Sequence, residues 1–108
     1  MYYTYMIRCE DNSLYTGYTS DIEKRMKAHF GKAKIAAKYT KSHKPVKLEA
    51  TWKTKEKSNA CKLEYYIKKL NKIEKEDIIE GSRISKYLKG KVDCRRFVRF
   101  NLNYENNK

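Results

Sequence analysis

Two charged side chains fall inside the apolar stripes of predicted helices. Ile22, Met26 and His29 recur at helical spacing, and Arg25 lies in the middle of that stripe. Glu64 lies within a second stripe, which consists of Ala60, Leu63, Ile67 and Leu70. A guanidinium and a carboxylate directed toward a core indicate either a buried ion pair or a site that binds charged ligands.

The two explanations lead to different chemistry. Burying an unpaired charge is costly, so each of these side chains needs a partner. In the first explanation Arg25 and Glu64 pair with each other, and periodicity alone favours this. In the second, both line a pocket in which Glu64 holds a metal ion and Arg25 holds a phosphate.

Tyrosines and a glycine on a predicted hairpin favour the pocket. Tyr5 lies on the first strand and Tyr15 on the second, and Gly17 leaves room for a backbone or a substrate to approach closely. Tyrosine is common in sheets, so most of the ten tyrosines need no other role. Combined with Arg25 and Glu64, however, these residues provide the groups that phosphodiester hydrolysis requires.

The composition indicates a polyanionic partner. The 108 residues include 26 lysines and arginines but only 13 acids, which gives a formal net charge of +13. A small basic domain attracts nucleic acid; an anionic membrane is the alternative, but the basic residues do not share one helix with a bulky apolar face. No membrane span or signal peptide is recognisable, so we expect a cytoplasmic protein. The three scattered cysteines fit neither a disulfide framework nor a zinc site.

The elements that position these groups begin with a hairpin and a helix. Residues 2–10 alternate as a strand, a polar turn follows at 10–13, and residues 14–19 return as a second strand. Ser20, with Glu23 three residues later, is predicted to cap a helix that ends at Gly31.

A further strand and two helices complete the predicted domain. The strand covers 46–52, with these residues facing inward: Val46, Leu48, Ala50 and Trp52. One helix is predicted to start at Ser58, and the next is capped by Asn71 with Glu74 and ends at Gly81. The order β-β-α-β-α-α predicts an α+β domain over 1–81, a small antiparallel three-stranded sheet flanked by helices. Residues 82–108 are predicted to be a basic extension that is partly disordered or adds one strand around 96–102.

The ordered motifs resemble those of the GIY-YIG nuclease domain, and above all its small stand-alone bacterial branch. The resemblance covers roughly residues 1–80 and rests on Tyr3-Thr4-Tyr5, Tyr15-Thr16-Gly17, Arg25 and Glu64. The runs "YYTYMIRCEDNSLYTGYTSDIEKR", "AKYTKSHKPVKL" and "EYYIKKLNKIEKEDII" read like that branch. The first motif keeps only its final tyrosine, the second has Thr16 in its middle, and Tyr18 stands where many members have lysine.

The resemblance implies a metal-dependent endonuclease, with DNA processing or repair as the expected setting. Glu64 would be the only protein ligand of a single Mg²⁺ (or Mn²⁺) ion, and Arg25 would hold the scissile phosphate. A motif tyrosine would deprotonate the attacking water. Tyr5 and Tyr15 are both candidates, with Tyr5 preferred as the base and Tyr15 positioning the water. His29 would assist through hydrogen bonds to the phosphate or to a tyrosine.

Lysines are expected to hold the nucleic-acid backbone without reading its sequence. The predicted contacts are Lys32, Lys34, Lys38, Lys41, Lys44, Lys68 and Lys69. DNA is the favoured nucleic acid, and the protein is expected to be a monomer or a weak homodimer. The alternative function is a nucleic-acid-binding module without catalysis, associated with the nucleoid or the ribosome.

Overall fold

The computed structural model describes residues 1–31 and 43–105. The strands are β1 (Tyr2–Cys9), β2 (Leu14–Thr19), β3 (Pro45–Thr54) and β4 (Val98–Phe100). The helices are α1 (Ile22–Phe30), α3 (Lys57–Lys69), α4 (Lys72–Ile79) and α5 (Ser85–Leu88), and a 3₁₀ helix covers Cys94–Arg96. Within the described ranges, no helix is long and apolar enough to cross a membrane.

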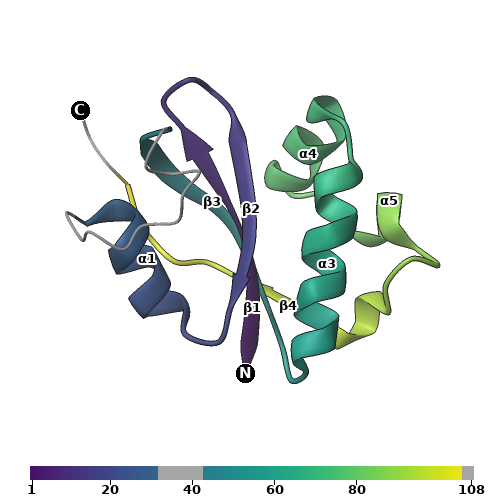
Figure 1. Ribbon diagram of the computed structural model, residues 1–108. Coiled ribbons are helices and arrows are strands. Elements are labelled where there is room, and N and C mark those ends of the chain that lie inside the picture. Colours follow the sequence, from purple (N-terminus) through teal and green to yellow (C-terminus); the bar gives the residue numbers. More distant parts are fainter. Residues whose placement is uncertain (32–42, 106–108) are drawn as a thin grey trace.

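The strands form one antiparallel sheet in the order β2-β1-β3-β4. The predicted α+β class is therefore confirmed, but the sheet has four strands rather than three. The additional strand, β4, lies within the stretch 96–102 where the sequence allowed one. Helix α1 covers one face of the sheet, and α3 and α4 cover the other (Figure 1). The strand β2 is an edge strand of the sheet, with α1 on one side of it and α3 on the other (Figure 1).

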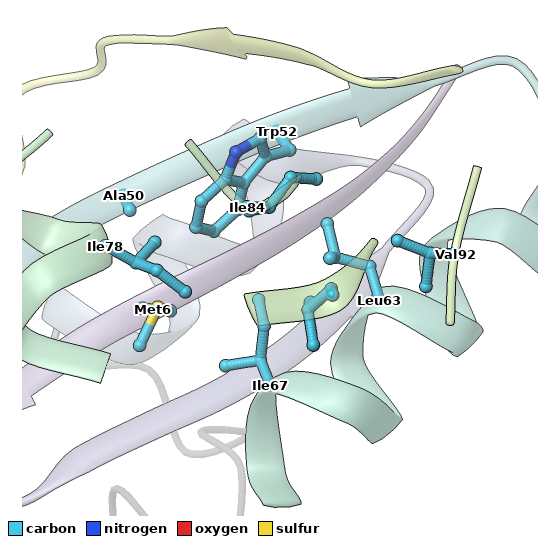
Figure 2. Packing of buried hydrophobic residues seen from close by; sticks show 9 residues of the cluster. Met6, Ala50, Trp52, Leu63, Ile67, Ile78, Ile84 and Val92 are labelled. Carbon is cyan, nitrogen blue, oxygen red and sulfur yellow. The ribbon is translucent and has the colours of Figure 1, made fainter. Parts of the chain in front are cut away.

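The alternation predicted for the first strand supplies two cores, one on each face. Tyr5, Ile7 and Cys9 of β1 pack with Ile22 and Met26 of α1. The intervening Met6 belongs to the other core, which α3 and α4 cover (Figure 2). Its remaining members are Ala50, Trp52, Leu63, Ile67, Ile78, Ile84, Leu88 and Val92. The last three come from residues after Gly81, so this part of the chain packs into the same core.

An irregularity in β3 makes one part of the sequence prediction wrong. Leu48 and Ala50 were expected on the same face, yet Leu48 packs with the α1 core and Ala50 with the α3 core. The pairing of β1 with β3 jumps from Met6↔Ala50 to Ile7↔Leu48, so Glu49 is an extra residue in β3. An inserted residue of this kind reverses the faces of the side chains that precede it in the strand, up to a second irregularity at Val46.

Of the three helix starts predicted from the sequence, the structure confirms one. Asn71 and Glu74 form the predicted capping box at the start of α4. Helix α1 is instead capped by Asp21, whose side chain accepts a hydrogen bond from the Lys24 N–H, so the predicted cap at Ser20 is one residue too early. Helix α3 begins after Glu56 rather than at Ser58.

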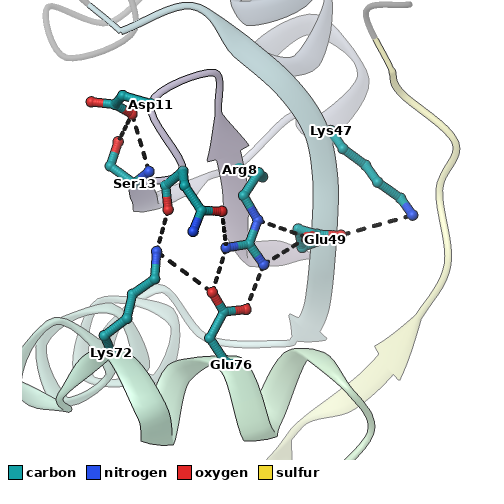
Figure 3. Close-up of polar contacts among 8 residues, drawn as sticks. Arg8, Asp11, Ser13, Lys47, Glu49, Lys72 and Glu76 are labelled. Atoms are coloured by element: carbon teal, nitrogen blue, oxygen red, sulfur yellow. Dashed lines mark hydrogen bonds and ion pairs between the residues drawn. The ribbon is translucent and has the colours of Figure 1, made fainter.

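A cluster of charged side chains connects α4 to the sheet. The guanidinium of Arg8 on β1 donates two hydrogen bonds of 2.5 Å to the Glu76 carboxylate of α4 and one of 3.0 Å to Glu49 of β3 (Figure 3). Arg8 holds the pKa of the Glu76 carboxyl below its usual range. The bidentate pair therefore links α4 directly to β1.

Candidate active site

A polar hollow of ≈500 Å³ opens at the β2 edge of the sheet. We call it the β2-edge hollow, and its lining residues are Tyr2, Tyr15, Tyr18, Thr19, Ser20, Arg25, Lys57 and Glu64. They come from β1, β2, the β2–α1 connection, α1 and α3. Because α1 and α3 cover opposite faces, they share a hollow only by reaching past the edge strand β2 from both sides (Figure 1).

The hollow brings Arg25 and Glu64 together without joining them in an ion pair. Among the ion pairs of the residues that the structure describes, Glu64 contacts Lys68 at 3.6 Å and Arg25 contacts no carboxylate. Both side chains are partly buried at the margins of their apolar stripes. The structure therefore does not support the ion-pair explanation for these two residues.

Tyr5, Tyr15 and His29 form an aromatic cluster beside the β2-edge hollow. The Tyr5 hydroxyl and the His29 Nε2 are 3.0 Å apart and share a hydrogen bond. The ring centroid of Tyr15 is 6.1 Å from that of Tyr5 and 5.5 Å from that of His29. Tyr15 lines the hollow, whereas Tyr5 is completely buried and His29 is 4% exposed.

Gly17 makes this arrangement possible. Tyr5 and Gly17 are paired across β1 and β2. A Cβ atom at Gly17 would lie only 2.6 Å from the Tyr5 hydroxyl and 2.7 Å from its Cζ. The sequence predicted that a backbone or substrate would approach this glycine; in the structure the phenol of Tyr5 does so.

Burial controls the charges of the cluster. It raises the pKa of Tyr5 well above the usual value, and the nearby Tyr15 acts in the same direction while Arg25 opposes them. Burial also lowers the pKa of His29 to about 4, with a smaller contribution from the positive charge of Arg25. At neutral pH Tyr5 is therefore protonated and His29 is uncharged.

Five lining residues were not among the predicted site residues, namely Tyr2, Tyr18, Thr19, Ser20 and Lys57, and two of these bear on the chemistry of the hollow. Lys57 places a second cation beside Arg25, and Tyr18 occupies the position where the resemblance led us to expect lysine. A hydrogen bond to the Cys61 thiol raises the pKa of the Tyr18 phenol. A signal for Lys57 exists in the sequence, because Lys57 precedes Glu64 by seven residues and such residues lie on one face of a helix.

The predicted nucleic-acid contacts are only partly within the described residues. Lys32, Lys34, Lys38 and Lys41 lie outside them. Lys68 and Lys69 are exposed at the end of α3, where Lys68 pairs with Glu64. Lys44 is exposed next to the β1–β2 turn, and its carbonyl accepts a hydrogen bond from the Glu10 N–H.

The donors in the β2-edge hollow fit a hard divalent cation better than a transition metal. Among the residues that the structure describes, Glu64 is the only carboxylate that lines the hollow. The described residues contain no group of three or more His, Cys, Asp or Glu side chains that could hold a metal ion. Mg²⁺ is commonly bound by one or two carboxylates while it retains several waters, so a single glutamate beside open solvent is compatible with it.

Comparisons with known proteins place the chain among small bacterial proteins. Residues 1–77 match the GIY-YIG catalytic domain. The chain is 54% identical over 78 residues to the UPF0213 protein FN1575 of Fusobacterium nucleatum, covering 72% of this chain and 76% of that protein. It is 45% identical over 86 residues to the UPF0213 protein YazA of Bacillus subtilis, covering 79% and 84%. The solution NMR structure of the UPF0213 protein BH0048 of Bacillus halodurans is 38% identical, with a TM-score of 0.49 and coverage of 82% and 96%.

Proposed function

The chain belongs to the GIY-YIG catalytic domain family, and from this premise we propose that it is a metal-dependent endonuclease that hydrolyses phosphodiester bonds in nucleic acid. DNA is the favoured substrate, and DNA processing or repair is the proposed setting. The observation that carries the proposal is the convergence of Arg25 and Glu64. They come from helices on opposite faces of the sheet, yet they line one hollow with Tyr15 and remain unpaired with each other.

Glu64 is the proposed ligand of one Mg²⁺ or Mn²⁺ ion. Its side chain is 21% exposed, and its only ion-pair partner among the described residues is Lys68, which is 52% exposed. An exposed lysine at 3.6 Å is a weak partner, so a divalent cation competes with it easily. An ion held by Glu64 would supply positive charge to stabilise the negative charge that develops on the phosphate and on the leaving oxygen.

Arg25 and Lys57 are the proposed phosphate contacts. The planar guanidinium of Arg25 matches two phosphate oxygens, and the ammonium of Lys57 adds a point charge on the α3 side of the hollow. Two cations held by different helices restrict the orientation of a phosphodiester more than one cation does. This assignment gives Lys57 the role that Tyr18 cannot perform, because a phenol carries no positive charge.

We assign the contact with the attacking water to Tyr15. The sequence left both tyrosines open with a preference for Tyr5, but Tyr15 lines the hollow whereas Tyr5 has no exposed surface. A base must reach the proton that it removes, either directly or through one water. The hydrogen bond between Tyr5 and His29 then holds both rings in place beside Tyr15, so we propose Tyr5 and His29 as positioning residues.

The net positive charge of the chain supports binding of nucleic acid through contacts with its phosphate backbone. Lys68 and Lys69 are exposed within one turn or so of Glu64, where they are suited to phosphates that flank the cut. Lys32, Lys34, Lys38, Lys41 and Lys44 remain proposed contacts for more distant phosphates. A cytoplasmic location and a monomeric or weakly dimeric state also remain predictions.

A cleavage assay on defined structures tests the proposal. Labelled DNA and RNA substrates (single-stranded, duplex, nicked, branched and with overhangs) are incubated with the protein in Mg²⁺, Mn²⁺ or EDTA. We expect cleavage of at least one DNA substrate with either ion and none in EDTA. Salt-dependent binding of the whole panel without cleavage of any member would refute the nuclease and favour the non-catalytic binding module.

A further inference from the structure

A second hollow is lined mainly by residues outside the segment that matches the GIY-YIG domain. Its volume is ≈390 Å³, within the range typical of small-molecule sites. It lies between β3, the connection from α4 to α5, and the stretch from the 3₁₀ helix to β4. Apart from Trp52, all its lining residues follow Ile79, the last residue of α4. In the part of the chain that the structure describes, it shares no lining residue with the β2-edge hollow.

The chemistry of this second hollow combines cations with an apolar wall. The partly exposed Phe97 supplies accessible apolar surface above the buried Trp52 and Ile84, which are 3% and 6% exposed, and Arg83, Arg95 and Arg99 supply the charge. No acid is among the lining residues that the structure describes. We call this site the arginine hollow. Trp52 and Ile84 lie next to each other within the core beneath it (Figure 2).

The three arginines are held differently. Arg99 lies over the Trp52 ring, 5.4 Å from its centroid, and donates hydrogen bonds of 2.6 and 3.0 Å to the carbonyls of Ile78 and Ile79. Its partners are neutral, so its positive charge is not cancelled. Arg83 is exposed and has no ion pair among those of the described residues, which leaves its guanidinium available.

The third arginine shares its carboxylate with a neighbour. Asp93 pairs with Arg95 at 3.2 Å and with Arg96 at 3.4 Å, so the two arginines exceed the single acid by one charge. Of Arg95 and Arg96, only Arg95 lines the hollow. The site therefore carries net positive charge around a partly aromatic wall, and a ligand that matches it has a planar apolar part and an anionic part.

We propose that the arginine hollow binds one unpaired nucleotide of a nucleic-acid strand. The base stacks on the partly exposed Phe97, above the buried Trp52, and its phosphate contacts the exposed Arg83 and Arg95. Unpaired bases are recognised in this way by aromatic rings and guanidinium planes, whereas a base inside a duplex is not accessible to such a site. The inference rests on the nucleic-acid binding of the proposed function but not on cleavage. It makes the substrate a structure with an unpaired nucleotide, such as an overhang, gap or flap.

The single tryptophan allows the site to be observed directly. Trp52 is the only tryptophan of the chain and lines the arginine hollow, so its fluorescence is sensitive to a ligand that binds there. The protein is titrated with dAMP and, separately, with inorganic phosphate, in EDTA. We expect saturable quenching by dAMP and none by phosphate at the same concentrations. Absence of quenching by dAMP, or equal quenching by phosphate, overturns the proposal.

Matched variants locate the binding. The double variant Arg83→Ala/Arg95→Ala removes two exposed cations of the hollow, and Lys89→Ala/Arg96→Ala removes two exposed cations of the same extension that do not line it. Quenching by dAMP should be lost in the first and kept in the second. An equal loss in both would show binding to general positive charge and would overturn the proposal. Thermal melting of both variants verifies that they are folded.

Binding of longer substrates gives a second readout. In EDTA, the wild type should bind a labelled duplex with a three-nucleotide overhang about tenfold more tightly than the blunt duplex, since one stacked base contributes about that factor. Arg83→Ala/Arg95→Ala should abolish this preference, and Lys89→Ala/Arg96→Ala should keep it. Cleavage by the wild type without quenching by dAMP would refute this site alone. Quenching without cleavage of any substrate would refute the nuclease alone.

Discussion

Acidification should destabilise the protein through His29. This side chain is 4% exposed and lies against the completely buried Tyr5. Burial, and secondarily the charge of Arg25, lower its pKa from the ordinary 6.5 to about 4. Protonation of the folded state is therefore unfavourable, whereas the imidazole of the unfolded chain is protonated at its ordinary pKa.

The sign and size of the effect follow from this difference. Between pH 6.5 and about pH 4 the unfolded state binds more protons than the folded state, so the free energy of unfolding decreases as the pH falls. The stabilisation is complete above pH 6.5 and is lost below about pH 4. A difference of about 2.5 pKa units corresponds to about 3 kcal/mol, a large part of the stability of a small domain.

Urea unfolding at pH 7, 6, 5 and 4 measures the effect when the wild type is compared with His29→Gln. The variant keeps a hydrogen-bonding side chain beside Tyr5 but does not titrate. Carboxylates affect both proteins alike, so the difference between them isolates His29. We expect the advantage of the wild type over the variant to decrease by about 3 kcal/mol from pH 7 to pH 4. A difference that stays constant across this range would refute the reasoning.

Three further variants test single contacts of the hairpin and of the β2-edge hollow. Gly17→Ala should lower the free energy of unfolding in urea by about 1–3 kcal/mol, because the new Cβ must displace Tyr5; an unchanged value would show that the phenol moves freely. Thr16→Val should raise the free energy of unfolding by about 1 kcal/mol, because the buried Thr16 hydroxyl has no hydrogen-bond partner in the described structure. A decrease in this free energy would indicate that a bound water satisfies the hydroxyl. Lys57→Ala should slow cleavage about tenfold or more, because a phosphate contact is lost. The control Lys62→Ala changes a lysine that is exposed on α3 outside the hollow, and it should not slow cleavage. Equal effects of the two substitutions would exclude a specific role of Lys57 in phosphate binding.

Periodicity predicted the alternation of the first strand and the residues at the margins of two helical stripes, but not that the sheet has a core on each face. The alternation in β1 placed Tyr5 and Met6 on opposite faces, and the structure confirms it. Arg25 and Glu64 stood out because each interrupted an apolar stripe, and both line the β2-edge hollow. Their chemical roles remain predictions, since burial and spacing show where a side chain lies but not what it binds.

Other features could not be read from the sequence for physical reasons. The extra residue Glu49 in β3 leaves no compositional signal, because a strand with an inserted residue has ordinary strand composition. Ser20 and Asp21 are adjacent and both suit a helix cap, so the choice depends on the geometry of the preceding strand. The arginine hollow joins Trp52 to residues about thirty or more positions later, and periodicity within one element cannot reveal such a contact.

Glu64→Gln provides the most direct test of the proposed nuclease. Mg²⁺-dependent cleavage is measured beside thermal melting without metal, with Glu10→Gln, at an exposed turn, as a matched control. The substitution keeps the side-chain volume and removes the charge that a hard cation requires. We predict that cleavage falls to background while the melting temperature stays within about 3 °C of the wild type, since only an exposed lysine loses its partner. Undiminished cleavage by Glu64→Gln, or a loss of about 3 kcal/mol of stability that marks a buried structural ion pair, would contradict the account.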